Sequence, residues 1–291
     1  MLEREASARL AAYFARIDYD GSTTVSEETL RSIHLLQSWN IPFENVDIHL
    51  DRGVSLLTDA LFEKLVGRRR GGYCYELNGL LAYVLTSLGF HVSMLAARTR
   101  LGGAMVAPKT HMLLLVEVAG RSWITDAGFG AYGLNTCVAL DPSVAVRCGN
   151  ESYRIVKERA PIYELQRAGA AGWLTLYDFT LVAMDPADFE VMNYFHSTNP
   201  ASRFRRRVVL SRVGEFTRTL LLDLDLRKGP IDEPSSDAIA DVASYRRALL
   251  DEFGIHLGRD GAEQLFESIV SRGESQWEQS ARLQMSQSRQ R

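Results

Sequence analysis

The sequence predicts an α+β fold in which helices come first, strands fill the middle and helices return near the end. Up to about residue 90, apolar residues recur at the period of an amphipathic helix. From 91 to about 213, short alternating runs separated by turn residues indicate antiparallel strands. The chain has 291 residues, of which 46% are hydrophobic, so it can bury a sizeable core in two or three subdomains.

Four helices are predicted in the first third, from apolar stripes at 10–17, 30–36, 61–65 and 77–88. Thr24 or Ser26 could cap the second helix and Thr58 the third, because a hydroxyl at that position accepts a backbone N–H of the first turn. The fourth helix begins at or just after Cys74, and Gly89 is its predicted stop.

Strands are predicted at 91–100, 111–118, 121–128, 152–158, 174–184 and 205–213, and further helices at 244–253 and 261–270. Ala119-Gly120 separates the second strand from the third, which predicts a β-hairpin with a two-residue loop. In that register His111 and Asp126 lie on one face as diagonal neighbours, within side-chain reach. A three-residue loop would place them on opposite faces, so the pairing depends on this turn.

Charge and composition exclude several functional classes. The formal net charge is -3, so no basic field directs the chain to nucleic acid. The N-terminal MLEREASARL is charged, unlike a signal peptide, and no apolar run reaches the length of a membrane span. The three cysteines cannot all pair within one chain, so we expect reduced thiols and a cytoplasmic protein. Neither CxxC nor HExxH spacing occurs, so no metal site is expected.

Cys74 lies between Gly71-Gly72 and the start of an apolar helix, within RRRGGYCYELNGLL at 68–81. A helix N-terminus and a neighbouring imidazolium both favour the thiolate, which is the nucleophilic form of cysteine. With His111 as base and Asp126 to orient it, Cys74 would complete a nucleophile–base–orienter arrangement. Taken singly, each residue more often has a structural role than a catalytic one. A lone cysteine is usually a buried apolar residue, a lone histidine is usually a hydrogen-bonded surface residue, and an aspartate before Ala-Gly is usually a turn former.

Five segments occur in a characteristic order. They are IPFENVDI (41–48), with His34 upstream, RGGYCYELN (70–78), THMLLLV (110–116), DAGFG (126–130) and FHSTNPASRF (195–204). Each resembles a segment of the arylamine N-acetyltransferase family, and their order and spacing agree with it over roughly 13–204. The resemblance implies an N-terminal helical bundle, a central β-barrel and a C-terminal α/β lid around a cysteine-protease-like catalytic core.

The resemblance also implies domain boundaries and a reaction. Residues 1–90 would form the bundle carrying the nucleophile, 91–200 the barrel carrying the histidine and aspartate, and 201–291 the lid, with C-terminal helices and a polar tail. The reaction would be acetyl-CoA-dependent N-acetylation of arylamines, arylhydrazines or hydrazides, as in xenobiotic metabolism. It would proceed by a ping-pong mechanism through an acetyl-cysteine, with acetyl-CoA as co-substrate and no permanently bound cofactor.

The family pattern assigns further roles by position. Phe43, Phe129 and Phe204 occur where the family lines its acceptor pocket with aromatic residues, although core packing is an equal alternative for Phe43. Thr110 and Gly130 occur where the family contacts the pantetheine arm of CoA.

Three features depart from the pattern or lie outside it. Asn199 replaces a histidine of the family's serine-threonine-histidine-proline segment, and 131–140 lacks the usual prolines, so the acceptor preference is in question. Cys137 in that segment could be a second exposed thiol. Arg203 and the three arginines after Phe204 could meet the CoA phosphates, but a solvated strand face is the favoured interpretation.

Other functions are compatible with the same residues. An amide synthase of the same superfamily would pass a carrier-bound acyl chain to an internal amine, and a cysteine hydrolase would use water as the acyl acceptor. A non-enzymatic binding module would keep its activity when Cys74 is alkylated, whereas either enzyme would lose it.

Overall fold

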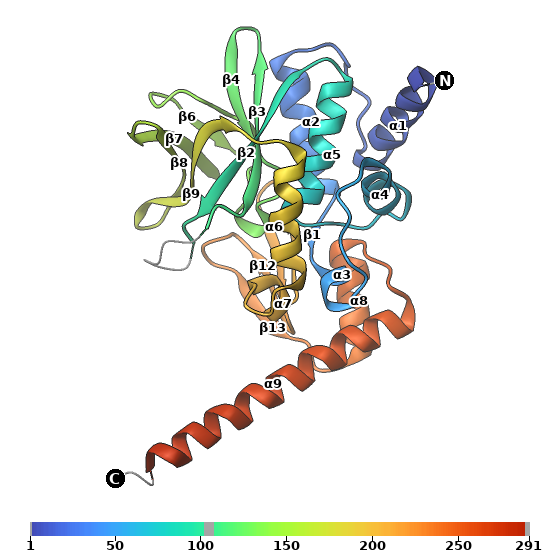
Figure 1. Cartoon of the computed structure of the whole chain (residues 1–291), viewed down its shortest axis with the longest axis vertical. Helices are drawn as coiled ribbons and strands as arrows, with labels where there is room; N and C mark the ends of the chain where they lie inside the picture. The colour runs from blue at the N-terminus through green and yellow to red at the C-terminus, as the bar shows by residue number, and fades with distance from the viewer. Residues whose placement is uncertain (1, 102–107, 289–291) are drawn as a thin grey trace.

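The computed structural model describes residues 2–101 and 108–288, and its parts follow the predicted order of helices, strands and a mixed end (Figure 1). The helical elements of the first third are α1 (Leu2–Ile17), α2 (Glu27–Asn40), α3 (Val46–His49), α4 (Thr58–Leu61), the π-helical turn η1 (Phe62–Gly67) and α5 (Cys74–Ser87). Helices α2 and α5 lie side by side next to the barrel, and α1 packs against both (Figure 1). These helices form the predicted bundle.

The helix boundaries agree with the sequence at two positions and differ at one. Ser26 caps α2, because its hydroxyl accepts the N–H of Thr29 at 3.1 Å. Gly89 follows α5 with a φ of 94°, a conformation that favours glycine and ends the helix. The predicted Thr58 cap is wrong. Leu57 occupies the N-cap position of α4 without a side-chain hydrogen bond, and Thr58 is the first helical residue.

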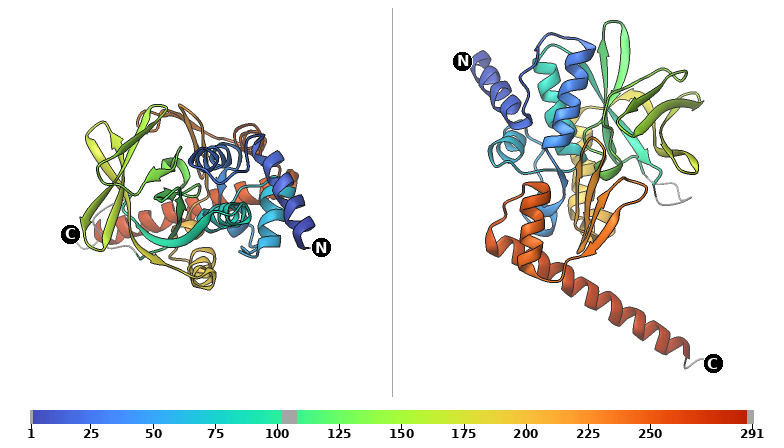
Figure 2. Two further views of the ribbon diagram at one scale, coloured as in Figure 1. Left: turned by 90° about the horizontal axis from the view of Figure 1, so that it is seen from above. Right: turned by 180° about the vertical axis from the view of Figure 1, so that it is seen from behind.

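Within the described residues, eight antiparallel strands form one sheet in the order β5-β4-β3-β2-β9-β8-β7-β6. They are β2 (His91–Thr99), β3 (His111–Val118), β4 (Arg121–Thr125), β5 (Val138–Ala139), β6 (Ala145–Cys148), β7 (Glu151–Arg159), β8 (Ile162–Gly169) and β9 (Gly172–Ala183). Strand β5 approaches β6 and β7, so the sheet curls into a nearly closed barrel, as the view from above shows (Figure 2).

The hairpin of β3 and β4 has the predicted two-residue loop. Ala119 and Gly120 have φ values of 51° and 71°, as a type I′ turn requires. Val118 pairs with Arg121, which confirms the predicted register. Strand β4 ends at Thr125, earlier than predicted, so the chain leaves the sheet just before the DAGFG segment.

A second, five-stranded sheet lies below the barrel in Figure 1 and forms the lid. Its elements are β1 (Phe43–Glu44), β10 (Val209–Val213), β11 (Arg218–Leu222), β12 (Asp225–Gly229) and β13 (Ser235–Ala238), followed by α8 (Val242–Phe253) and α9 (Gly258–Ser288). The helices α6 (Pro186–Thr198) and α7 (Arg203–Arg206) connect the barrel to it. Because β1 belongs to the first third of the chain and pairs with β10, backbone hydrogen bonds tie the lid to the bundle.

The arginine cluster near residue 205 is helical at its start. The hydroxyl of Ser202 accepts the N–H of Phe204 and caps α7, so β10 begins only at Val209. The interpretation of these arginines as a solvated strand face is therefore wrong.

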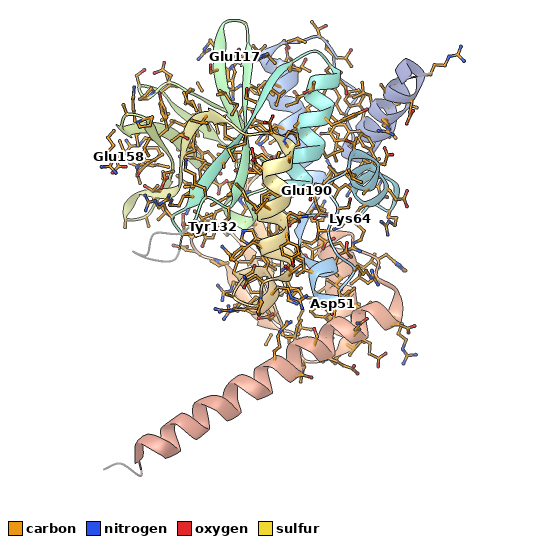
Figure 3. All side chains as sticks on the ribbon, viewed as in Figure 1. Asp51, Lys64, Glu117, Tyr132, Glu158 and Glu190 are labelled. Atoms are coloured by element: carbon orange, nitrogen blue, oxygen red, sulfur yellow. The ribbon has the colours of Figure 1, made fainter. Side chains whose placement is uncertain are left out.

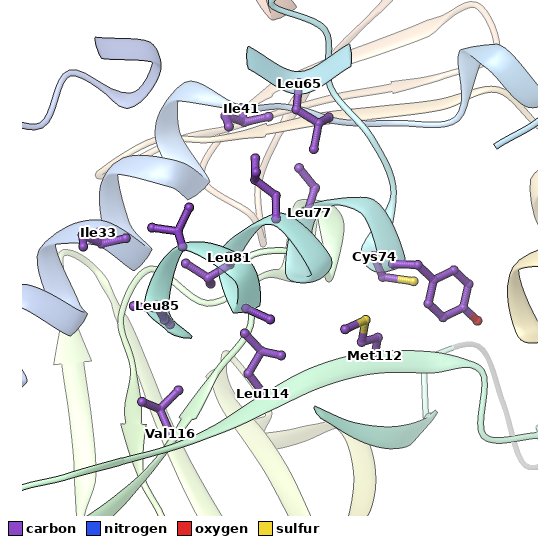
Figure 4. Close-up of a cluster of buried hydrophobic side chains, with 14 of the residues drawn as sticks. Ile33, Ile41, Leu65, Cys74, Leu77, Leu81, Leu85, Met112, Leu114 and Val116 are labelled. Carbon is purple, nitrogen blue, oxygen red and sulfur yellow. The ribbon is translucent and has the colours of Figure 1, made fainter. Parts of the chain in front are cut away.

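The largest apolar core joins α5 to β3 (Figure 4). Its central side chains are at most 2% exposed and include Leu77, Leu81 and Leu85 of α5 and Met112, Leu114 and Val116 of β3. Burial of one such side chain contributes roughly 1.5–3 kcal/mol, so together they fix the helix against the strand. The start of α5, with Cys74, and the start of β3, with His111, are thereby held in a fixed relation.

Candidate active site

Cys74 is the first residue of α5 and is buried, with 3% of its surface exposed. The turn before it is held by Glu76, whose carboxylate accepts the N–H of Tyr73 at 3.0 Å. Gly71 is required there, because a Cβ at this position would lie 2.2 Å from the carbonyl oxygen of Pro42. The first N–H groups of α5 have no partner within the helix, so this end of the helix can stabilise negative charge.

His111 and Asp126 form the pair that the hairpin register predicts. The ring Nε2 of His111 donates to Oδ2 of Asp126 at 2.7 Å, and both side chains are buried. The other carboxylate oxygen, Oδ1, accepts the side-chain amide of Asn78 and the N–H of Gly128, each at 2.9 Å. With Nε2 occupied, Nδ1 is the ring nitrogen of His111 that is available to Cys74.

The surroundings of His111 and Asp126 favour the charged form of both side chains. Burial alone would lower the pKa of His111, but the charge of Asp126, its hydrogen bond and the interaction with Cys74 outweigh burial and raise this pKa to about 10. Burial likewise opposes ionisation of Asp126, yet the charge of His111 and the donors around the carboxylate hold its pKa below the usual value. The pair is therefore an imidazolium and a carboxylate at neutral pH.

Gly128 brings the DAGFG segment against Cys74. A Cβ on Gly128 would lie 2.8 Å from Cα of Cys74 and 2.8 Å from Nδ2 of Asn78, so only glycine fits without displacement. This close approach explains why the segment after β4 leaves the sheet, and it places Asp126 beside the start of α5.

A cavity of about 430 Å³ opens next to Cys74. All predicted site residues except Asp126 line it: Phe43, Cys74, Thr110, His111, Phe129, Gly130 and Phe204. Asp126 is fully buried and reaches the cavity only through its hydrogen bond with His111. The cavity lies where the barrel meets the lid, and Tyr132, another wall residue, is at the lower end of the barrel beside the lid strands (Figure 3).

The sequence did not single out several other wall residues. They include Thr99, Leu101, His196, Val209, Leu220, Leu222 and Arg227. His196 donates from Nε2 to the carbonyl oxygen of Thr110 at 3.3 Å, and burial lowers its pKa to about 4. The sequence could have identified His196 as a wall residue, because it belongs to the same FHSTNPASRF segment as Phe204. The lid residues gave no such signal, because they reach the cavity only through tertiary packing.

Two of the remaining expectations concern residues away from the wall. Cys137 is fully buried, and burial raises its pKa to about 12, so the expectation of a second exposed thiol is wrong. Asn199 ends α6 and accepts the N–H of Ala201, and it is not among the wall residues. Asn199, which replaces the family's histidine, therefore lies outside the cavity wall. By contrast, Ala131 and Tyr132 of the segment that lacks prolines line the cavity.

Among the side chains that the structure describes, those of residues 4–101 and 108–273, no three His, Cys, Asp or Glu gather as metal ligands would. Nor does any helix in the described part of the chain have the length and apolarity to cross a bilayer.

Comparison with known proteins gives concordant matches. A family model described as N-acetyltransferase matches residues 26–262. The arylamine N-acetyltransferase of Escherichia coli (strain K12) is 35% identical over 259 residues, covering 87% of this chain and 90% of that protein. The structure of the arylamine N-acetyltransferase from Salmonella typhimurium has a TM-score of 0.84 at 31% identity, covering 89% of this chain and 98% of that one. The Mycobacterium marinum enzyme, solved in complex with CoA, has a TM-score of 0.83 at 32% identity and the same coverage.

The fold and these matches define the protein as an acyltransferase. The chain belongs to the arylamine N-acetyltransferase family, as the five sequence segments predicted. A purely binding role is overturned by this membership.

Proposed function

We propose that the protein transfers an acetyl group from acetyl-CoA to an arylamine, arylhydrazine or hydrazide through an acetyl-cysteine on Cys74. The observation that carries the proposal is that Cys74 and His111 line one cavity, with Asp126 bound to the far side of the imidazole. This is the arrangement of an activated nucleophile, a base and an orienting carboxylate.

In the first half of the reaction, the thiolate of Cys74 attacks the thioester carbonyl of acetyl-CoA. The resulting oxyanion is stabilised by unpaired N–H groups at the start of α5. When it collapses, the carbon–sulfur bond to CoA breaks, and CoA leaves as a thiol with a proton from His111. Cys74 is then acetylated, and His111 is neutral.

In the second half, the amine attacks the acetyl-cysteine. Neutral His111 takes the proton that the amine loses, and Asp126 stabilises the imidazolium that forms again. The carbon–sulfur bond to Cys74 breaks, which releases the amide and restores the thiolate–imidazolium pair. Protons and charges therefore balance over the two halves without another reactant.

The walls of the cavity support separate acceptor and donor sides. The rings of Phe43 and Phe204 are 5.9 Å apart, and Phe129 packs edge-on against His111 at 4.9 Å. We assign these three rings to the acceptor, because flat aryl groups stack favourably on aromatic side chains. Thr110 and Gly130 are assigned to the pantetheine arm, and the relative solved with CoA supports a CoA donor.

Release of CoA thiol tests this function. Acetyl-CoA alone should give one equivalent of CoA per enzyme, and adding an arylamine should make release continuous. Continuous release without amine would indicate a hydrolase. No release from acetyl-CoA, together with acylation by a carrier-bound chain, would indicate an amide synthase.

A further inference from the structure

The wall of the cavity contains a buried histidine to which the proposed acetyl-transfer steps give no role. His196 is 7% exposed and belongs to the buried face of α6. Its Nε2 lies 3.3 Å from the carbonyl oxygen of Thr110, and its Nδ1 lies 3.2 Å from Oγ of Ser202. The ring therefore bridges the residue before His111 and the residue that caps α7.

These two contacts fix the protonation state of the ring. A carbonyl oxygen can only accept, so Nε2 carries the proton and donates to Thr110. Burial lowers the pKa of His196 to about 4, and the positive charges of Arg203 and His111 act in the same direction, so the ring is neutral at pH 7. Nδ1 of this neutral ring can only accept, and Ser202 donates its hydroxyl proton to it. His196 thus has no free lone pair with which to act as a second base.

The same chain of hydrogen bonds continues at both ends. The carbonyl of Thr110 also accepts the hydroxyl of Tyr75, in the first turn of α5, at 2.6 Å. Oγ of Ser202 accepts the N–H of Phe204 at 3.2 Å. His196 therefore connects the start of α5 with α7 and the cavity wall that α7 carries.

We infer that His196 is a positioning residue for acetyl transfer, which holds the carbonyl of Thr110 and thereby the backbone of His111 in place. The inference rests on the proposed function and adds a residue to the machinery of the same site. Thr110 precedes the first paired residue of β3, so the strand ladder begins only at His111. Asp126 holds the imidazole of His111, and the carbonyl of Thr110 fixes the backbone from which that imidazole extends. A shift of this backbone would move Nδ1 of His111 away from the sulfur of Cys74 and weaken the thiolate–imidazolium pair.

Alkylation of Cys74 by iodoacetamide as a function of pH tests this role without any acyl transfer. The imidazolium of His111 keeps the thiol ionised to low pH, so a displaced ring should move the midpoint of alkylation upward. We expect His196→Phe, which keeps a buried ring but loses both hydrogen bonds, to raise the midpoint by roughly 0.5–1 pH unit, the equivalent of one net hydrogen bond. The rate of CoA release at saturating acetyl-CoA should fall about three- to tenfold.

Two further variants separate positioning from packing. The side-chain amide of His196→Gln reaches the position of Nε2 and can donate to Thr110, so the midpoint and the rate should stay close to those of the parent. Ser197→Ala removes a hydrogen bond to the carbonyl of Asn193 on the same helix, outside the cavity wall, and should also behave as the parent.

A parent-like midpoint in His196→Phe would overturn the inference. Equal shifts in His196→Phe and His196→Gln would also overturn it, because packing alone would then explain the effect. If His196→Phe does not fold, Ser202→Ala, which removes the donor to Nδ1, should raise the midpoint, and an unchanged midpoint there would overturn the inference as well. If the parent releases no CoA from acetyl-CoA while the midpoint still shifts, the proposed function fails and the role of His196 in holding His111 stands.

Discussion

At the scale of single residues, the proposed triad depends on what surrounds each side chain. His111 is an imidazolium because Asp126 outweighs the effect of burial. Asp126 is a carboxylate because the charge and hydrogen bond of His111, with the donors Asn78 and Gly128, outweigh the effect of burial. Cys74 lies at the start of α5, where the helix and His111 both favour negative charge. Each state can be changed by one substitution, so the assignment of roles is testable residue by residue.

Asp126→Asn tests the orienting role. The amide cannot stabilise the imidazolium, so burial dominates and the pKa of His111 falls from about 10. We expect acetyl transfer to fall by roughly 10²–10⁴-fold, and alkylation of Cys74 by iodoacetamide at pH 6 to slow by about tenfold or more. Parent-like alkylation and turnover in Asp126→Asn would rule out the triad.

The same substitution should also change how the free energy of unfolding depends on pH. The raised pKa of His111 stabilises the fold fully below about pH 6.5, and this contribution is lost as pH rises through about 10. The lowered pKa of Asp126 stabilises the fold above about pH 4 and is lost on further acidification. The unfolding free energy that Asp126→Asn removes should therefore be larger at pH 5.5 than at pH 9.5 in urea titrations. Equal losses at the two pH values would contradict the coupling.

Phe43 tests the acceptor wall. The ring is only 7% exposed and packs on Phe204, so Phe43→Leu is preferable to alanine, which would also leave a cavity. We expect Phe43→Leu to raise the Michaelis constant for aryl amines by up to roughly tenfold, through lost ring stacking. Stopped-flow acetylation by acetyl-CoA should change little. Equal losses in both half-reactions would assign Phe43 to the fold or to the donor side.

At the scale of elements, the sequence predicted what depends on local geometry. The Ala119-Gly120 loop set the hairpin register, because two consecutive residues with positive φ permit one turn type. The Ser26 cap and the Gly89 stop follow from equally local chemistry. The Thr58 cap failed because the preceding residue took the N-cap position, and nothing in the sequence distinguished the two.

The start of α5 also depends on a buried charge network that the sequence did not indicate. Lys64, from the π-helical turn η1, binds Glu76 at 2.7 Å and Asp47 at 2.8 Å, and Glu76 accepts the N–H of Tyr73, the residue before Cys74. The three charged residues of this network are distant in sequence, so they can pair only when the bundle is folded. The network is therefore a tertiary property that positions Cys74.

Lys64→Met tests this network. It leaves the buried carboxylate of Glu76 without its cation, whereas Asp47 keeps Arg70 at 3.1 Å, so we expect the free energy of unfolding to fall by about 3–5 kcal/mol, and acetylation of Cys74 to slow. Urea unfolding and acetylation kinetics measure the two effects. The double variant Lys64→Met/Glu76→Gln should recover part of the stability, and Arg68→Met, at an exposed ion pair, should cost about 0–1 kcal/mol. A Lys64→Met enzyme as stable as the parent would refute the network's role.

At the scale of the whole molecule, the cavity exists only where three parts meet. Cys74 comes from the bundle, His111 and Phe129 from the barrel segments, and Leu220 and Arg227 from the lid. Sequence motifs identified the first two contributions, because their residues cluster in short recognisable segments. The lid contribution has no such motif and depends on how β11 and β12 dock, so it could not be predicted.

Arg218 tests the docking of lid and barrel. From β11, it binds Glu151 and the carbonyl oxygen of Gly133, both in the barrel part, and it is 4% exposed. Arg218→Met leaves the largely buried Glu151 carboxylate without its cation and with only the neutral donors Asn135 and Tyr153, so we expect the free energy of unfolding in urea to fall by about 3–5 kcal/mol. Adding Glu151→Gln should recover part of this loss. A loss below about 1 kcal/mol would show that the ion pair does not hold the two parts together.

The central claim is that Cys74 carries the acetyl group. The most direct measurement is mass spectrometry of the intact protein and of its peptides after incubation with acetyl-CoA and no acceptor. We predict one added acetyl group, located on Cys74, that disappears when an arylamine is added, and no added acetyl group in Cys74→Ala. An acetyl group on Cys137 or Cys148 with Cys74 unmodified, or acetyl transfer by Cys74→Ala, would contradict the account.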